Sequence, residues 1–83
     1  MVFQGGYMSE QVVVSYAKLW KLLVDKKINK TQLKDLAHIS TNAVAKMSKN
    51  ESVSLETLAK VCYALDCNIG DVIDIIIETN KEI

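Results

Sequence analysis

Apolar side chains recur every three or four residues after Ser15, which is the period of an α-helix with one buried face. The stripe consists of Tyr16, Leu19, Trp20, Leu23 and Val24. Ser15 is a suitable N-cap, because its hydroxyl can accept a hydrogen bond from the backbone of the first turn. These residues predict a first helix in which Trp20 faces the core and does not stack on a nucleic-acid base.

Two further helices, separated by a tight turn, are predicted between residues 29 and 48. Asn29 and Gln32 have the spacing of a capping box for the first of them, with Thr31 as an alternative cap. Ser40 is the expected cap of the second, which runs to about Ser48. The inward positions are Leu33, Leu36, Ala37, Ile39, Val44 and Met47. This pattern is typical of two short helices that cross steeply over a shared core.

His38 occupies the turn between these helices, where the backbone is expected to become left-handed. Histidine tolerates a positive φ comparatively well among residues other than glycine. A place in the turn therefore explains this single histidine better than a role in catalysis.

The rest of the chain predicts two more helices and two short strands. Ser54 is a suitable cap for a fourth helix. Its apolar positions are Leu55, Leu58, Ala59, Cys62 and Leu65. Residues 66–70 end this helix, and residues 71–73 predict a short fifth one. The β-branched runs Val12–Val14 and Ile75–Ile77 are strand candidates, which would bring the ends of the domain together if they paired.

Length and composition agree with one small helical domain. The chain has 83 residues, of which 49% are hydrophobic, with three glycines and no proline. A domain rich in turns would contain more of both. We therefore expect an all-α domain in residues 15–78, between tails at residues 1–14 and 79–83. Within the first tail, Phe3-Gln4-Gly5 is similar to the end of a protease-cleavage sequence, so residues 1–8 are either native or a remnant of such a site.

The charges are unevenly distributed, although the net charge of the whole chain is zero. Residues 15–49 contain eight lysines and two aspartates, whereas residues 50–83 contain two lysines and seven acidic residues. A basic segment attracts nucleic-acid phosphates, and an acidic one is a candidate surface for a protein partner. Lysines on ordinary solvated helix faces would give the same count, so charge alone does not decide the function.

Other function classes find little support in the sequence. Cys62 and Cys67 lack neighbouring ligands at metal-binding spacing, and we expect two small buried thiols in a reducing, cytoplasmic compartment. The apolar runs are too short to cross a membrane, and no signal peptide is apparent. No glycine-rich phosphate loop or acid–base cluster is present, so we expect neither an enzyme nor a metal or cofactor.

The outward face of the predicted third helix is the most informative feature of the chain. It carries small hydrogen-bonding residues in its first turn and lysines further along, namely Ser40, Thr41, Asn42, Ala43, Lys46 and Lys49. Such a face suits the DNA major groove, where donors, acceptors and thymine methyl groups distinguish the base pairs. A purely structural bundle would explain the apolar stripes but not this polar turn beside lysines. These residues therefore predict sequence-specific binding of double-stranded DNA.

In order and spacing, these segments resemble the Cro/CI type of helix-turn-helix domain found in phage repressors and in the xenobiotic-response-element family of small bacterial regulators. The matching stretches are residues 16–27, 30–33, 39–47 (ISTNAVAKM), 53–62 and 65–72. The resemblance implies a compact five-helix, lambda-repressor-like fold in a bacterial or phage-encoded transcriptional regulator. Two departures are His38, where the family has glycine, and the complete absence of arginine.

Position by position, the resemblance implies roles for individual residues. Base-reading residues would be Thr41, Asn42, Ala43 and Lys46. Phosphate-binding residues would be Lys30, Thr31, Gln32, Ser40, Lys49 and Asn50. Without arginine the commonest guanine contact is missing, so we expect an A·T-leaning site in which Asn42 reads adenine and Lys46 can still bind guanine.

A regulator of this size is expected to bind DNA as a homodimer, because one short helix gives too little contact for typical specific affinity. The candidate dimer residues are Val72, Ile73, Ile75, Ile76 and Ile77, with packing inside a single chain as the alternative. An alternative function is that of a protein-interaction module, such as an antitoxin or a phage-encoded antagonist, which binds a basic partner through its acidic C-terminal half.

Overall fold

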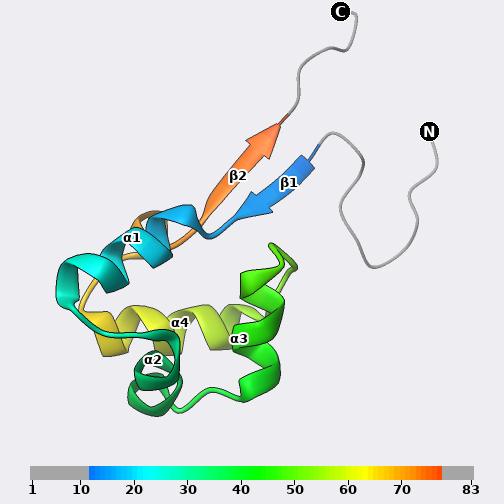
Figure 1. The fold of residues 1–83 in the computed structure, drawn as a ribbon. Helices are drawn as coiled ribbons and strands as arrows, with labels where there is room; N and C mark the ends of the chain where they lie inside the picture. Colours follow the sequence, from blue (N-terminus) through cyan, green and yellow to red (C-terminus); the bar gives the residue numbers. More distant parts are fainter. Residues whose placement is uncertain (1–11, 78–83) are drawn as a thin grey trace, which may run out of the picture.

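The computed structural model of the chain describes residues 12–77. It contains four α-helices, one turn of 3₁₀ helix (η1) and a two-stranded antiparallel sheet (Figure 1). The elements are β1 Val12–Ser15, α1 Ala17–Lys26, α2 Lys30–Ala37, α3 Thr41–Ser48, α4 Leu55–Leu65, η1 Ile69–Asp71 and β2 Asp74–Ile77. Residues 1–11 and 78–83, which include Phe3-Gln4-Gly5 and most of the predicted tails, lie outside the described residues.

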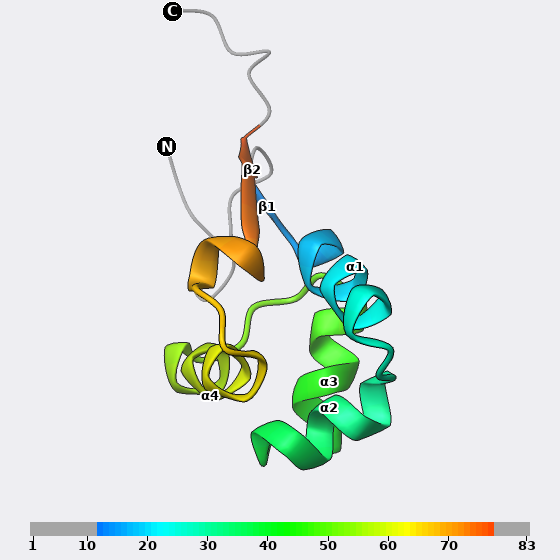
Figure 2. The ribbon, with the colours of Figure 1, turned by 90° about the vertical axis from the view of Figure 1, so that its left-hand side faces the viewer.

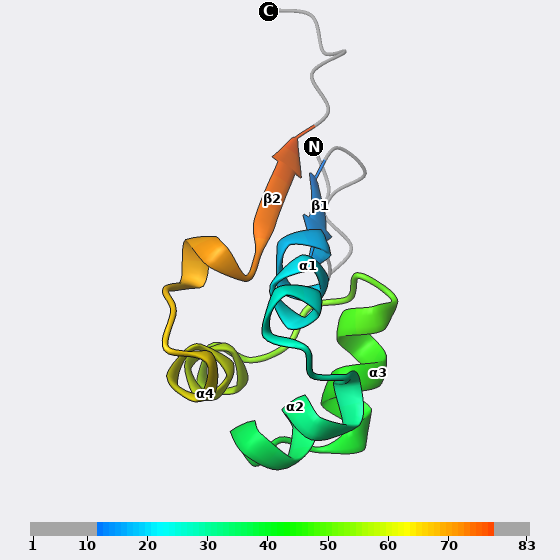
Figure 3. The ribbon, with the colours of Figure 1, turned by 60° about the vertical axis from the view of Figure 1, so that its left-hand side comes forward.

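The α-helices form one group, from which the two strands project as a ribbon. Figure 2 shows α4 on one side of this group and α2 with α3 on the other, below α1. Figure 3 shows the ribbon rising from the start of α1, away from α2 and α4. The strands pair in the register Val12↔Ile77, Val13↔Ile76, Val14↔Ile75 and Ser15↔Asp74. Both β-branched runs are therefore strands, as predicted, and they pair with each other.

One hydrophobic core joins the helices to the base of the ribbon. Its most enclosed side chains are Tyr16, Leu19, Leu33, Met47, Val61 and Val72. On α2 the contact is made by Leu33 and Ala37, which lie four residues apart on one side of the helix. Leu36 was expected to face inward but is 54% exposed, because it lies on the flank of this narrow contact. Val24 of α1 is likewise exposed.

Short-range hydrogen bonds set where α2 and α3 begin. Asn29 and Gln32 form the predicted capping box, in which each side-chain oxygen accepts the other residue's backbone N–H at 2.8 Å. Ser40 Oγ accepts the N–H of Ala43 at 3.0 Å. Both predicted caps are confirmed, and they satisfy N–H groups that a helix start leaves without partners.

The starts of the other two long helices differ from each other. Ser54 caps α4 as predicted, with its Oγ accepting the N–H of Thr57 at 3.1 Å. Ser15 ends β1, because strand pairing extends one residue further than the sequence pattern indicated, and Tyr16 takes the N-cap position without a side-chain cap of its own. The Oγ of Ser15 still accepts the N–H of Ala17, the first residue of α1, at 3.3 Å, so Ser15 acts from one residue before the N-cap position.

The predicted fifth helix is reduced to the single turn η1, which Asn68 caps. The side chain of Val72 enters the core directly after this turn, and the chain then extends into β2. A continued helix would conflict with strand pairing by the β-branched isoleucines that follow. The expectation of an all-α, five-helix domain is therefore corrected to four α-helices and a β-ribbon.

His38 ends α2 in the left-handed conformation, with φ 57° and ψ 45°. Replacing it with glycine should raise the free energy of unfolding by roughly 0.5–1 kcal/mol. Glycine removes the Cβ clash of this conformation, and the gain is partly offset by the greater freedom of the unfolded chain. Urea denaturation measures the change. Ala45→Gly inside α3 is the control and should destabilise by about 1 kcal/mol. A lower midpoint for His38→Gly would show instead that the imidazole ring stabilises the turn.

Candidate nucleic-acid interface

Helix α3 has one buried side and one exposed polar side. Met47 is completely buried, and Val44 is partly buried beside it. Ser48 is exposed and accepts a hydrogen bond from Lys30. The other exposed residues are Thr41, Asn42, Ala45 and Lys46, with Lys49 directly after the helix. Their spacing of one, four, five and eight positions from Thr41 is that of one helix face. The structure thus brings the predicted residues Thr41, Asn42, Lys46 and Lys49 onto one continuous surface, which we call the α3 face.

Two alanines of α3 differ from what the sequence indicated. Ala43 is partly buried, so it lies at the edge of the α3 face and exposes little of its methyl group. Ala45 is exposed within the face but was not expected to contact DNA. Its position three residues after Asn42 and four after Thr41 is the periodic signal that identifies it.

The first turn of α2, the helix before α3 in the chain, carries three of the predicted phosphate contacts, Lys30, Thr31 and Gln32. Thr31 and Gln32 are both exposed. In the capping box Gln32 uses Oε1 to accept the N–H of Asn29. This bond fixes the orientation of the amide, so that Nε2 is the atom able to donate to a ligand.

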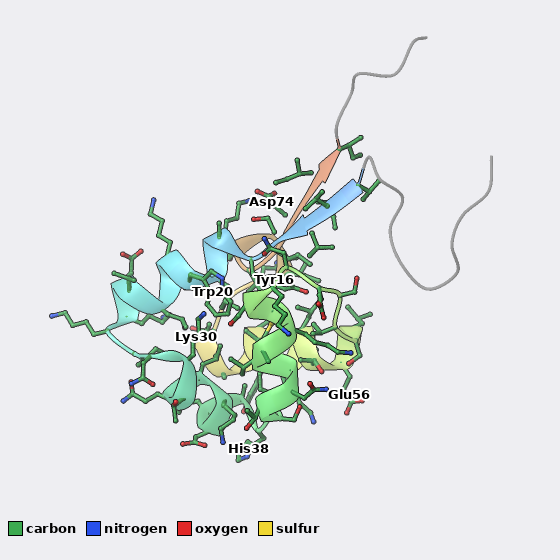
Figure 4. All side chains as sticks on the ribbon, turned by 45° about the vertical axis from the view of Figure 1, so that its right-hand side comes forward. Tyr16, Trp20, Lys30, His38, Glu56 and Asp74 are labelled. Carbon is green, nitrogen blue, oxygen red and sulfur yellow. The ribbon has the colours of Figure 1, made fainter. Side chains whose placement is uncertain are left out.

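Lys30, the first residue of α2, has partners within the protein. Its ammonium lies 4.2 Å from the centroid of the Trp20 ring. The same Nζ donates a hydrogen bond to Ser48 Oγ at 2.9 Å. Figure 4 shows Lys30 directly below Trp20, between α1 and α2. Trp20 packs against the core as predicted but is only partly buried, and its ring face is covered by this lysine.

The turn after α3 is tied to the start of α1. The phenol of Tyr16 donates to the backbone carbonyl of Glu51 at 2.7 Å, and its backbone N–H donates to Asn50 Oδ1 at 3.3 Å. Burial raises the pKa of the Tyr16 phenol above its ordinary value, against a smaller lowering by the backbone of Val53. The phenol therefore stays protonated at neutral pH and remains a hydrogen-bond donor. Asn50 keeps its Nδ2 as a donor beside the end of α3.

Folding offsets part of the charge asymmetry of the sequence, because lysines of the basic segment lie beside acidic residues of the C-terminal half. Lys18 Nζ lies 3.4 Å from Asp74 Oδ1 and donates to the carbonyl of Gly70 at 3.1 Å. Asp66 and Asp71 line the same hollow between α1 and η1 as Lys18. The acidic C-terminal half thus meets the lysines of α1, whereas Lys46 and Lys49 lie on the α3 face.

The two cysteines are free thiols, both partly buried against the core at the end of α4. Burial, and then the neighbouring Cys62, raise the pKa of the Cys67 thiol above its ordinary value. A protonated thiol is a poor nucleophile and a poor metal ligand. Within residues 12–77, no group of three His, Cys, Asp or Glu side chains could hold a metal ion. Among the helices of this part of the chain, none has the length and hydropathy needed to span a membrane.

Comparisons with known proteins agree with this geometry. The family model of the Cro/C1-type HTH DNA-binding domain matches residues 18–78. The crystal structure of the transcriptional regulator VanUg, Form II, is similar with a TM-score of 0.79 and 39% sequence identity, covering 90% of this chain and 100% of that chain. A comparison with curated proteins found no match. The chain belongs to the Cro/C1-type helix-turn-helix family of DNA-binding domains.

Proposed function

We propose that this chain is a transcriptional regulator that inserts α3 into the major groove of double-stranded DNA and reads base edges there. The observation that carries the proposal is the α3 face, a continuous exposed stripe of polar and small side chains on a helix whose other side is anchored by the buried Met47. A helix held in this way can enter a groove without unfolding its own core.

The chemistry of the α3 face suggests which bases are read. The amide of Asn42 can pair with adenine N6 and N7, and the ammonium of Lys46 can donate to guanine O6 or N7. The methyl group of Thr41 can pack on a thymine methyl group. Ala43 contributes only at the edge, because it is partly buried. Ala45 adds a small apolar surface in the centre of the face.

A set of polar groups around α3 is suited to the DNA backbone. They are the hydroxyl groups of Thr31 and Ser40, the amide Nε2 of Gln32, the ammonium of Lys49 and the amide Nδ2 of Asn50. Ser40 accepts a hydrogen bond as a cap, and its own hydroxyl hydrogen remains able to donate to phosphate. Such contacts orient a protein on DNA but do not read sequence. Lys30 differs from them because its ammonium has protein partners.

We further propose that a second copy of the chain packs against the ribbon, so that two α3 helices bind two half-sites. All four residues of β2 are exposed, including Ile75, Ile76 and Ile77 at 51%, 47% and 54%. A two-stranded ribbon with this much exposed apolar surface is marginal alone and presents open strand edges. Ile73 is partly buried at its base. Val72 is enclosed in the core of one chain and is not part of the proposed dimer surface.

A protein partner is the second candidate, and one observation favours it. Leu55 and Tyr63 of α4 are 71% and 91% exposed, and a groove lined by Leu36, Ala59 and Tyr63 lies between α2 and α4. Exposed apolar side chains grouped in this way are found at protein interfaces. This surface is separate from the α3 face, so partner binding and DNA binding are compatible.

The test of the proposed function is selection of binding sites from a pool of random DNA duplexes at low salt, carried out with the wild type, Asn42→Ala and Lys46→Ala. We expect a two-fold symmetric motif for the wild type. Each variant should lose about tenfold or more in affinity for that site and relax the preference at one position per half-site, since a bidentate base contact contributes about 1–3 kcal/mol. Lys60→Ala on α4, whose ammonium lies 3.7 Å from Glu56 Oε2, is the matched control and should bind like the wild type.

Three other results would count against parts of the proposal. Salt-sensitive binding without a motif would leave an electrostatic DNA binder that does not read sequence. A motif that is unchanged in both α3 variants would move base reading to another element. No binding to any duplex would favour the protein-partner candidate, for which the expected finding is a stoichiometric complex that Tyr63→Ala weakens.

A further inference from the structure

The ammonium of Lys30 connects three consecutive helices. Lys30 is the first residue of α2, Trp20 belongs to α1, and Ser48 is the last residue of α3. The Nζ atom lies 4.2 Å from the Trp20 ring centroid and 2.9 Å from Ser48 Oγ. A cation at this distance from a tryptophan ring is attracted by the negative face of the ring. One side chain thus makes two directed contacts across the junction of α1, α2 and α3.

Helix electrostatics favour this arrangement over one in which the side chain stays near its own backbone. The start of a helix carries partial positive charge, which is unfavourable for a lysine at the first position of α2. The end of a helix carries partial negative charge, and Ser48 is the last residue of α3. By reaching from the start of one helix to the end of another, the ammonium of Lys30 leaves an unfavourable field and enters a favourable one.

Helix α3 has few other anchors. It is eight residues long, and Met47 is its one buried residue. Its first turn is capped locally by Ser40, so this bond does not tie it to another helix. Two bonds from Tyr16 hold the turn that follows α3. The contact from Lys30 to Ser48 therefore lies where a small loss of restraint would change the angle at which α3 is presented.

We propose that Lys30 is a positioning residue for DNA reading, which holds the C-terminal end of α3 against α1 and α2 through Trp20 and Ser48. This assignment replaces the phosphate contact that the family resemblance implied for Lys30. Its effect on DNA rests on the proposed function, but the contacts themselves can be tested without DNA.

The two roles predict different behaviour in DNA binding. A lysine that contacts phosphate weakens binding to all sequences alike when it is removed, and the slope of log affinity against log salt falls by about 0.9. A positioning lysine weakens binding to the specific site, because the base-reading groups are misaligned. It leaves non-specific binding and the salt slope nearly unchanged.

The DNA experiment compares Lys30→Met with Lys49→Met, on the selected site and on random duplex over a range of salt concentrations. Methionine keeps an unbranched chain but removes the charge and the donors. For Lys30→Met we expect a loss of about three- to tenfold at the selected site, little loss on random duplex and an unchanged slope. For Lys49→Met we expect similar losses of affinity for the selected site and for random duplex, and a smaller slope of log affinity against log salt. Lys30→Arg should restore specific affinity, because arginine keeps the charge and stacks well on tryptophan.

A second experiment needs no DNA and uses Trp20, the one tryptophan of the chain, as reporter. Lys30→Met should change the fluorescence emission of Trp20, whereas Lys49→Met should not. In a double-mutant cycle of unfolding free energies, Lys30→Met and Ser48→Ala should be non-additive, because both remove the same hydrogen bond.

The results separate this inference from the proposed function. If Lys30→Met lowers the salt slope and weakens both DNAs equally, Lys30 is a phosphate contact and the inference is wrong. The inference would also be wrong if Lys30→Met left the Trp20 emission unchanged and the unfolding free energies of Lys30→Met and Ser48→Ala were additive. If the wild type selects no DNA motif, the proposed function fails, while the emission and the cycle still decide whether Lys30 holds α3. If Lys30→Met does not fold, Lys30→Arg and Ser48→Ala supply the same comparison, with Ser48→Ala expected to lose specific affinity at constant slope.

Discussion

Leu33→Ala should lower the free energy of unfolding by about 2–5 kcal/mol, the range for truncating a buried leucine. Leu33 is completely enclosed on α2, between the helices that form the core below α1. Truncation loses the burial of its methyl groups and leaves a cavity that short, capped helices can fill only in part. Small domains are stable by about 5–15 kcal/mol in total, so the variant is expected to be partly unfolded near physiological temperature.

Leu36→Ala is the matched control, with the same chemical change on the same helix. Leu36 is 54% exposed, so we expect a loss below about 1 kcal/mol. Urea denaturation followed by far-ultraviolet circular dichroism measures both. Equal losses in the two variants would mean that Leu36 is buried in solution, for instance by an occupant of the groove between α2 and α4.

Replacing the isoleucines of β2 should reduce affinity for a site with two half-sites by about a hundredfold or more. The estimate follows from the difference in affinity between specific binding by a dimer and non-specific binding by a single module. The first variant is Ile75→Thr with Ile77→Thr, and the second is Ile76→Thr, since these residues lie on opposite faces of the ribbon. Threonine is also β-branched, so the strand conformation is retained while apolar surface is removed.

Sedimentation equilibrium and DNA binding to whole sites and half-sites measure this effect. We expect the variant on the dimer face to be monomeric and to bind a half-site like the wild-type monomer. Tyr63→Thr is the control, because Tyr63 is 91% exposed on α4 and lines the groove between α2 and α4, from which the ribbon projects away (Figure 3). If both ribbon variants remain dimeric, the dimer forms elsewhere. If the wild type is monomeric and still binds a two-fold symmetric site tightly, the ribbon has another role.

The helix-turn-helix unit could be predicted from the sequence because its determinants are local. The capping box of Asn29 and Gln32 acts over three residues, as does the cap from Ser40 to Ala43. The left-handed turn at His38 depends on one residue and its immediate neighbours. Such short-range interactions depend only on residues that are close together in the sequence. The sequence pattern is therefore sufficient to locate α2, the turn and α3.

Periodicity also identified most of the α3 face, but not its edges. Thr41, Asn42, Lys46 and Lys49 are exposed together as expected. Ala43, expected on the exposed face, is partly buried, and Ala45, for which no role was predicted, is exposed, since alanine has no strong preference for either side of a helix. Which alanine lies outward depends on the angle at which α3 crosses its neighbours, and that angle is set by packing around Met47.

The end of the chain was predicted less well, because its conformation depends on a distant partner. Residues 71–73 have a helical pattern, yet Val72 is drawn into the core and the following isoleucines pair with β1. Strand pairing between residues more than fifty positions apart leaves no local signal beyond β-branching. The same pairing places Ser15 in β1, one residue before the N-cap position of α1.

Local sequence was thus sufficient to specify α2, α3 and α4 with their caps, and most of the polar α3 face that indicates DNA binding. Long-range contacts decided which lysines have partners within the protein and which remain available to bind DNA. Lys18 pairs with Asp74, which is far away in the chain. Lys30 contacts Trp20 and Ser48, which lie on the two neighbouring helices. A lysine side chain is long and flexible, so its sequence position limits its partners only weakly. Its role is set by the groups that the fold brings within reach of its ammonium.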